Sequence, residues 1–322
     1  MNIKNVLLIG GSGFVGGWIA NRLSERGIRV VIPSRHRDHT KKLTMMPTVY
    51  VVEANVNDPQ KLASLMKGMD AVINLVGILH DGDSSQPYGK RFAEAHVELP
   101  KKIIAAMKQT GVRRLVHMSA LKASADAPSS YLRSKAAGEA AVLAAAKDLD
   151  VTLFRPSVIF GPNDAFLNKF ASLLNLFPVL PLAGATARFQ PVYIADVADA
   201  MVDCLTRSDT FGQVYELAGP RSYSLREMVD YVAKLSGRCR LVFNLGGGLA
   251  TLQARILSLL PNPPLSPDNL RSMQVDNLTD GARNYPGWDP KPLESIAPTY
   301  LGKVKIKSRL DGFRSHAGRA GS

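Results

Sequence analysis

A short apolar run that leads directly into a glycine-rich turn constrains the fold of this chain more than any other feature. The run Val6–Ile9 is followed by the segment GGSGFVG (residues 10–16) and by a helical pattern of apolar residues that stops at Gly27. Glycines let a backbone turn tightly and approach a phosphate, and the following helix presents unpaired N–H groups and the positive end of its dipole. The pattern predicts a turn that binds the pyrophosphate of a dinucleotide; a purely structural turn is the alternative.

The glycine spacing leaves the type of turn open. It fits both G-x-x-G-x-x-G (10, 13, 16) and G-x-G-x-x-G (11, 13, 16). The residues expected to line the coenzyme phosphates are Gly10, Gly13, Phe14, Val15 and Gly16.

Strand-like and helical segments alternate over the first two-thirds of the 322 residues. This order predicts an α/β fold, a Rossmann-type doubly wound parallel sheet with a smaller, mainly C-terminal substrate lobe. The expected strands are 49–52, 71–76, 114–118 and 151–155, the expected helices are 59–67, 92–109 and 131–147, and 192–206 and 214–235 are expected strand-to-helix units. We place the coenzyme-binding core at 1–160, the remaining core elements and the lobe at 161–300, and a basic, disordered tail at 303–322.

Two apolar stretches belong to the expected lobe. Residues 166–182 predict one helix that ends in a proline-containing turn. The Leu- and Gly-rich stretch 241–260 has two interpretations: the packed face of the lobe, which we favour, or an amphipathic helix at a hydrophobic pocket or a membrane interface.

Composition limits the cellular compartment and the kinds of site that we expect for this chain. No run reaches the roughly 18 consecutive apolar residues of a membrane span, and the first strand starts too close to Met1 for a signal peptide. The cysteines, Cys204 and Cys239, are too few for a disulfide framework, and the histidines show no metal-ligand spacing. We therefore expect a cytoplasmic protein without a metal site.

The formal net charge of +13 bears on partners. No nucleic-acid-binding module is recognisable, so specific nucleic-acid binding is not expected. An anionic membrane surface, which would make the protein peripheral to the inner membrane of a bacterium, or an acidic partner would fit the charge, as would a basic protein without either.

The residues after the strand predicted at 29–32, the second along the chain, bear on coenzyme choice. Dinucleotide folds that prefer NAD place an acid here for the ribose 2′-OH, whereas this chain has Ser34 with Arg35 and Arg37. A guanidinium can grip a 2′-phosphate through charge-assisted hydrogen bonds, so NADP(H) is favoured and NAD(H) is the alternative. By position, Asn55 and Val56 would contact the adenine, and Val76 and Gly77 the ribose.

A second chemical signal is the pair Tyr131 and Lys135. Four-residue spacing puts both side chains on one face of a helix. A nearby ammonium group is expected to lower the pKa of the phenol, which would make Tyr131 a proton donor and acceptor in carbonyl–alcohol chemistry.

With these motifs the chain resembles the short-chain dehydrogenase/reductase superfamily, in its extended or atypical branch. The resemblance rests on the glycine turn, on Tyr131 with Lys135, and on Arg155-Pro156 followed by FGP (160–162). The segments NLVGIL (74–79), HMSAL (117–121), YLRSKAAGE (131–139) and FQPVY (189–193) are similar to the subgroup of the nucleotide-binding accessory subunit of mitochondrial complex I and its bacterial relatives.

The resemblance implies a domain that holds NADP(H), with Tyr131, Lys135 and Pro156 near the nicotinamide end. Active extended members commonly end the fifth strand in Ser-Ser or Ser-Thr, whose second hydroxyl polarises the substrate carbonyl. This chain has Ser119-Ala120, so the second hydroxyl is missing and Ser119 is the candidate to replace it.

Two functions therefore stay open. The favoured one is an NADP(H)-dependent oxidoreductase on an apolar carbonyl or quinone-related compound, with Tyr131, Lys135 and Ser119 as the catalytic residues. The alternative is a non-catalytic, nucleotide-stabilised accessory or assembly protein of a respiratory complex, with a nucleotide-ratio sensor as a further variant.

Overall fold

The computed structural model describes residues 2–35, 40, 42–82, 85–237, 240–260 and 263–302. Arg37, Cys239 and the tail 303–322 lie outside the described residues, so the predictions made for them are not tested. Among the described residues, no helix has the length and hydropathy needed to cross a membrane.

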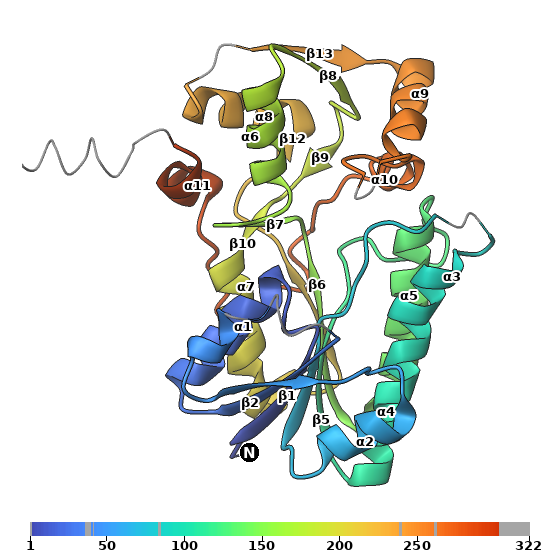
Figure 1. Cartoon of the computed structure of the whole chain (residues 1–322), viewed down its shortest axis with the longest axis vertical. Helices are drawn as coiled ribbons and strands as arrows, with labels where there is room; N and C mark the ends of the chain where they lie inside the picture. The colour runs from blue at the N-terminus through green and yellow to red at the C-terminus, as the bar shows by residue number, and fades with distance from the viewer. Residues whose placement is uncertain are drawn as a thin grey trace, which may run out of the picture.

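A seven-stranded, all-parallel sheet forms the centre of the molecule (Figure 1). The strands in spatial order are β11 (Gln213–Leu217), β6 (Asp150–Pro156), β5 (Arg114–Met118), β4 (Ala71–Asn74), β1 (Asn5–Ile9), β2 (Arg29–Ser34) and β3 (Val49–Glu53). The order reverses between β1 and β4, and such a reversal opens a ligand crevice at the carboxyl ends of these strands. The prediction of a doubly wound Rossmann-type sheet is confirmed.

Helices cover both faces of this sheet. One face carries α1 (Phe14–Glu25) and α7 (Ile194–Asp203); the other carries α2 (Pro59–Met66), α4 (Leu99–Thr110) and α5 (Ser130–Ala144). The sequence of β1 is continuously apolar because both faces of the strand are covered by helices. Val6 and Leu8 pack toward α1, whereas Leu7 and Ile9 pack toward α2 and α4.

The helix expected at 92–109 has a π-helical segment that the sequence did not predict. It consists of α3 (Lys90–Phe92), the π segment Ala93–Glu98 and α4, and it stops at Gly111, whose φ of 79° suits a left-handed cap. A Cβ atom on Gly138 of α5 would overlap the carbonyl oxygen of His96, so the π segment and α5 are in close contact.

A smaller lobe lies beyond the carboxyl ends of the strands (Figure 1). It contains α6 (Leu167–Leu176), β8 (Val179–Ala183), α8 (Leu225–Leu235), β13 (Leu241–Leu245), α9 (Gly247–Leu257), α10 (Pro267–Ser272) and α11 (Leu293–Leu301). Short pairs of strands, β7 (Ile159–Phe160) with β10 (Val192–Tyr193) and β9 (Arg188–Phe189) with β12 (Tyr223–Ser224), lead into it. Short 3-10 turns occur at Leu43–Met45, Ala145–Lys147, Cys204–Thr206 and Ser208–Thr210.

Both predictions for the apolar stretches of the lobe need correction. The single helix expected over 166–182 ends at Leu176, because Pro178 cannot continue a helix and favours an extended Phe177, and β8 follows. The stretch 241–260 begins as a strand, and its α9 buries only Ala250 and Ala254 while Leu249, Leu252 and Ile256 are exposed. The favoured interpretation as a packed face is therefore wrong.

Candidate functional site

The glycine turn joins β1 to α1, as predicted, and most of its glycines are required by the fold itself. Gly10 has a φ of +80°, and a Cβ there would lie 3.1 Å from backbone atoms of Leu75 and Val76, which directly follow the neighbouring strand β4. A Cβ on Gly16 would overlap the Cα and carbonyl oxygen of Gly11. These glycines let the turn fold tightly against β4 and against its own helix.

Gly13 is the exception, because its packing leaves room. A Cβ there would meet only the Gly10 oxygen, at an ordinary 3.5 Å, and the residue is exposed. It is also the N-cap of α1 and offers no side chain, so no described side chain caps the first N–H groups of Phe14 and Val15. An open cradle beside uncapped N–H groups fits a pyrophosphate.

The residues proposed for coenzyme selectivity lie at the carboxyl ends of the neighbouring strands. Ser34 ends β2 and Arg35 is exposed immediately after it. Asn55 follows β3; its Oδ1 accepts a hydrogen bond from the Asn57 N–H at 3.0 Å and keeps a second lone pair for another donor. Val56 is partly buried beside it.

Lys135 lies where two strands of the central sheet end. Its Nζ donates to the carbonyl oxygen of Met118 at 3.1 Å and to that of Val76 at 3.5 Å. A Cβ on the exposed Gly77 would come within 3.2 Å of the same Nζ. Burial lowers the pKa of Lys135 to about 8, against a smaller opposing effect of Glu139. The described chain thus brings Lys135, Val76 and Gly77 together.

Tyr131 lies one turn before Lys135 on α5. Its ring makes edge-on contacts with Phe92 and His96, at centroid distances of 6.1 and 5.6 Å, and packs against Ala120. Burial raises the pKa of the phenol to about 12. The lowering of this pKa expected from Lys135 is therefore wrong, because burial determines the shift.

Ser119 has a buried hydroxyl without a described partner. Its backbone N–H donates to the Phe154 oxygen at 2.7 Å, while its Oγ is hydrogen-bonded to no described residue. A buried, unsatisfied hydroxyl costs about 1–3 kcal/mol, which makes such a group a candidate for ligand binding. Ala120, the next residue, offers no hydroxyl and packs in the apolar cluster beside Tyr131.

His96 belongs to the site but was missed by the sequence analysis. Its Nε2 accepts from the Ile78 N–H at 3.0 Å, so Nδ1 carries the proton and donates to Ser134 Oγ at 2.8 Å. Ser134 in turn donates to the Tyr131 carbonyl oxygen at 2.8 Å. The π segment positions His96 for this chain of bonds, and no local sequence pattern predicts that segment.

A second buried histidine lies at the end of β5. The Asn74 side chain donates to His117 Nδ1 at 3.1 Å, and Asn74 Oδ1 accepts from the Val76 N–H. Burial, with a further effect of Lys135, lowers the pKa of His117 to about 3 and that of His96 to about 2. Both imidazoles are therefore neutral at pH 7.

These histidines predict a stability loss in acid. A folded-state pKa below the unfolded value of 6.5 means that acid favours the unfolded chain, so this contribution is present above pH 6.5 and is lost as the pH falls toward 3. Between pH 7 and pH 5 we expect His117 to account for a loss of about 2 kcal/mol in the free energy of unfolding. Urea unfolding of wild type and His117→Asn at both pH values measures it; equal losses in the two proteins would contradict the assignment.

The comparisons with known proteins bear directly on this arrangement. The model of the NAD dependent epimerase/dehydratase family matches residues 6–218, from β1 to the end of β11. The chain belongs to this family.

Individual known proteins are similar to this family member in sequence or in fold. Subunit 9 of the NADH dehydrogenase (ubiquinone) 1 alpha subcomplex from Arabidopsis thaliana mitochondria is 29% identical over 283 residues, which cover 84% of this chain and 69% of that protein. A ceramide reductase of Caulobacter vibrioides is 28% identical and covers 80% of each chain. A dTDP-glucose 4,6-dehydratase from Streptomyces venezuelae, solved with NAD, superposes with a TM-score of 0.73 at 18% identity and covers 96% of this chain and 98% of that one.

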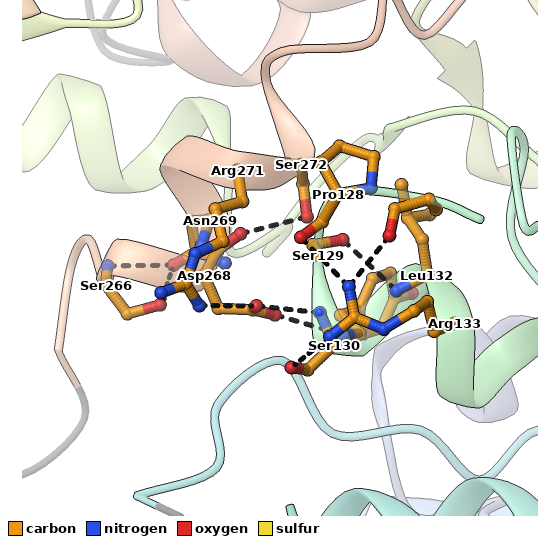
Figure 2. Close-up of polar contacts among 12 residues, drawn as sticks. Pro128, Ser129, Ser130, Leu132, Arg133, Ser266, Asp268, Asn269, Arg271 and Ser272 are labelled. Atoms are coloured by element: carbon orange, nitrogen blue, oxygen red, sulfur yellow. Dashed lines mark hydrogen bonds and ion pairs between the residues drawn. The ribbon is translucent and has the colours of Figure 1, made fainter. Parts of the chain in front are cut away.

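In this member of the epimerase/dehydratase family, a side chain of the lobe caps the helix that carries Tyr131 (Figure 2). Both carboxylate oxygens of Asp268, on α10, accept hydrogen bonds from the first turn of α5: from the Ser130 N–H at 2.8 Å and the Tyr131 N–H at 3.0 Å. Ser129 caps the Leu132 N–H at 3.2 Å. Because a carboxylate at a helix N-terminus is stabilised by the helix dipole, this contact ties the lobe to the site.

We expect Asp268→Ala to lower the free energy of unfolding by about 1–2 kcal/mol, because it leaves two N–H groups of α5 without their acceptor. Urea unfolding measures the change. Asp230→Ala is the matched control, since Asp230 makes an exposed ion pair with Arg226 and its loss should cost less than about 0.5 kcal/mol. Equal effects of the two substitutions would show that the contact of Asp268 with α5 does not stabilise the folded protein.

A cavity of about 380 Å³ opens beside the loop that precedes α5. Its lining includes Lys122, Ala127, Arg155 and Glu216. Arg155 is ion-paired with Glu139 on α5 and, at 3.6 Å, with Glu216 on β11. The cavity reaches Ala127, which belongs to the apolar cluster against which Tyr131 packs.

Proposed function

We propose that this chain is an NADP(H)-dependent oxidoreductase that reduces a carbonyl group of an apolar compound. One observation carries the proposal: Lys135, Tyr131 and the unpaired hydroxyl of Ser119 gather at the carboxyl ends of β4 and β5, beside the glycine turn. This is the crevice at which open α/β sheets bind ligands.

The residues that would hold the coenzyme follow from their positions. Gly13, Phe14 and Val15 would take the pyrophosphate through backbone N–H groups, and Arg35 with Arg37 the 2′-phosphate. Asn55 and Val56 would contact the adenine, and Val76, Gly77, Lys135 and Pro156 the nicotinamide half. When bound, the coenzyme would supply the hydride.

The protein's own groups would handle the proton and the carbonyl. With its pKa near 12, Tyr131 is protonated at neutral pH and can donate its proton to a carbonyl oxygen as hydride reaches the carbon. Lys135 is mostly charged below pH 8 and would stabilise the tyrosinate that results. Ser119 would hydrogen-bond the carbonyl oxygen.

The apolar nature of the substrate is supported by two observations. At the site itself, Tyr131 packs against an apolar cluster made of Ala120, Ala127 and Leu132. The similarity to a protein named ceramide reductase agrees with a long-chain carbonyl compound, and a quinone-related compound is the other member of this class.

A second candidate is favoured by Ala120 and by the similarity to subunits of respiratory NADH dehydrogenase. In it the chain docks on a respiratory-complex protein, and bound nucleotide stabilises the fold without turning over. Loss of one transition-state hydrogen bond can lower a rate by about 10²-fold or more. The missing hydroxyl at Ala120 therefore predicts slow turnover, which favours this second candidate.

The test starts with the wild-type protein. Calorimetry with NADPH and NADH should give tighter binding of NADPH, and a panel of long-chain ketones and quinones should contain a compound that oxidises NADPH catalytically. Binding without turnover of any compound, together with nucleotide that stays bound through purification, would favour the accessory function. Absence of binding of both nucleotides would contradict both candidates.

A further inference from the structure

The lobe presents an apolar face that lies on β8, β13, α9 and the residues next to them. The exposed large hydrophobic side chains that form it, from Val179 at 41% to Leu259 at 83% exposure, are Leu176, Phe177, Val179, Leu241, Phe243, Leu249, Leu252, Ile256, Leu259 and Leu260. Elsewhere in the described chain, the exposed side chains of this size and kind are Met45, Tyr50 and Leu79. We call these ten residues the apolar face.

The elements that carry this face are neighbours in space. Strand β13 pairs in parallel with β8, and the Gln253 side chain of α9 donates to the Pro181 oxygen of β8 at 2.9 Å. Figure 1 shows β8, β13 and α9 at the end of the molecule away from the central sheet. The residues of the apolar face therefore lie on elements that are neighbours in the lobe.

Helix α9 is unusual in which of its apolar side chains it buries. It buries the small residues Ala250 and Ala254 and exposes Leu249, Leu252 and Ile256. Burying the larger side chains instead would have removed more apolar area from water, which normally stabilises a fold. Large contiguous apolar patches are rare on isolated proteins and mark interaction sites.

Charge indicates what covers the face. Residues 176–183 and 241–260 contain no Asp or Glu, and their single charged residue, Arg255, is exposed on α9. Arg240 precedes β13 directly, and the whole chain carries a net charge of +13. A second copy of the chain would bring like charges together with no acid on the face to pair them.

We propose that the apolar face binds the surface of an anionic phospholipid bilayer. The leucine, isoleucine and phenylalanine side chains insert at the boundary between headgroups and acyl chains, and Arg255 pairs with lipid phosphates. This proposal goes beyond the proposed function and does not depend on coenzyme binding.

Vesicle flotation of the full chain tests the proposal. Vesicles of phosphatidylcholine with phosphatidylglycerol should bind the protein, and vesicles of phosphatidylcholine alone should bind it at least about tenfold more weakly. Leu252→Gln with Ile256→Gln should reduce binding to the anionic vesicles at least about tenfold, because two inserted apolar side chains are lost. The matched control is Met45→Gln with Tyr50→Gln, which removes two exposed apolar side chains elsewhere and should bind like wild type.

Two further substitutions, each of which removes one positive charge, test the electrostatic part of the proposal. Arg255→Gln should weaken binding to the anionic vesicles, and Lys67→Gln, an exposed cation on the central domain, should not. Thermal unfolding verifies that each variant is folded. The proposal is overturned by absence of binding to anionic vesicles, by equal binding of wild type and Leu252→Gln/Ile256→Gln, or by equal binding to neutral vesicles. It is also overturned if wild type forms a dimer that Leu252→Gln/Ile256→Gln dissociates, because the face is then an interface between two copies.

Discussion

Replacing Tyr131 by phenylalanine is expected to lower turnover of the apolar carbonyl substrate by about 10²–10⁴-fold. The substitution removes one oxygen and leaves the ring that packs against Phe92 and His96. The affinity for NADPH, measured by calorimetry, should change by less than about twofold, because the backbone of the glycine turn is untouched.

The control for this substitution is Tyr231→Phe, which removes the hydroxyl of a partly buried tyrosine on α8 of the lobe. Its turnover should equal that of wild type. Unchanged turnover of Tyr131→Phe would exclude Tyr131 as the proton donor. A weaker NADPH affinity with unchanged turnover would assign the phenol to coenzyme binding instead.

The second large effect is expected from Gly16→Ala. The new Cβ would overlap the Cα and carbonyl oxygen of Gly11, which are backbone atoms and cannot rotate away. The turn must therefore shift, and the N–H groups of Phe14 and Val15 shift with it. Charge-assisted hydrogen bonds to a phosphate contribute about 1.5–3 kcal/mol each, so the loss of two predicts an affinity for NADPH about 10²–10⁴-fold weaker.

Gly17 provides the matched control in the same helix. The nearest atom that a Cβ there would meet is Leu43 Cδ2, at 4.0 Å, so Gly17→Ala fits without displacement. Because alanine favours helices over glycine by about 1 kcal/mol, this variant should bind NADPH like wild type and be slightly more stable. Equal NADPH affinities of the two variants would contradict the proposed place of the pyrophosphate.

The core of the fold was predictable because its signals are local. The strand at 114–118 and the stop at Gly111 agree with the structure to the residue, and the stop was predictable because a left-handed cap favours glycine. Strand 71–76 ends at Asn74, two residues early, and the Asn74 side chain there accepts a hydrogen bond from the Val76 N–H.

The site was predictable in its residue types but not in its electrostatics. Spacing predicted that Tyr131 and Lys135 share a face of α5, yet the pKa of Tyr131 is raised because Phe92 and His96, distant in sequence, bury the ring. His96 could not be predicted at all, since its position depends on a π segment that is in close contact with Gly138.

The sequence by itself determined the alternation of strands and helices, the glycine turn and the Tyr131–Lys135 pair, because each depends on residues within a few positions of one another. Only the tertiary structure decided which side of α9 faces water, that Asp268 caps the helix of Tyr131, and that the Ser119 hydroxyl has no described partner. These features depend on contacts between segments that are far apart in the chain, and local patterns carry no information about which of those segments meet.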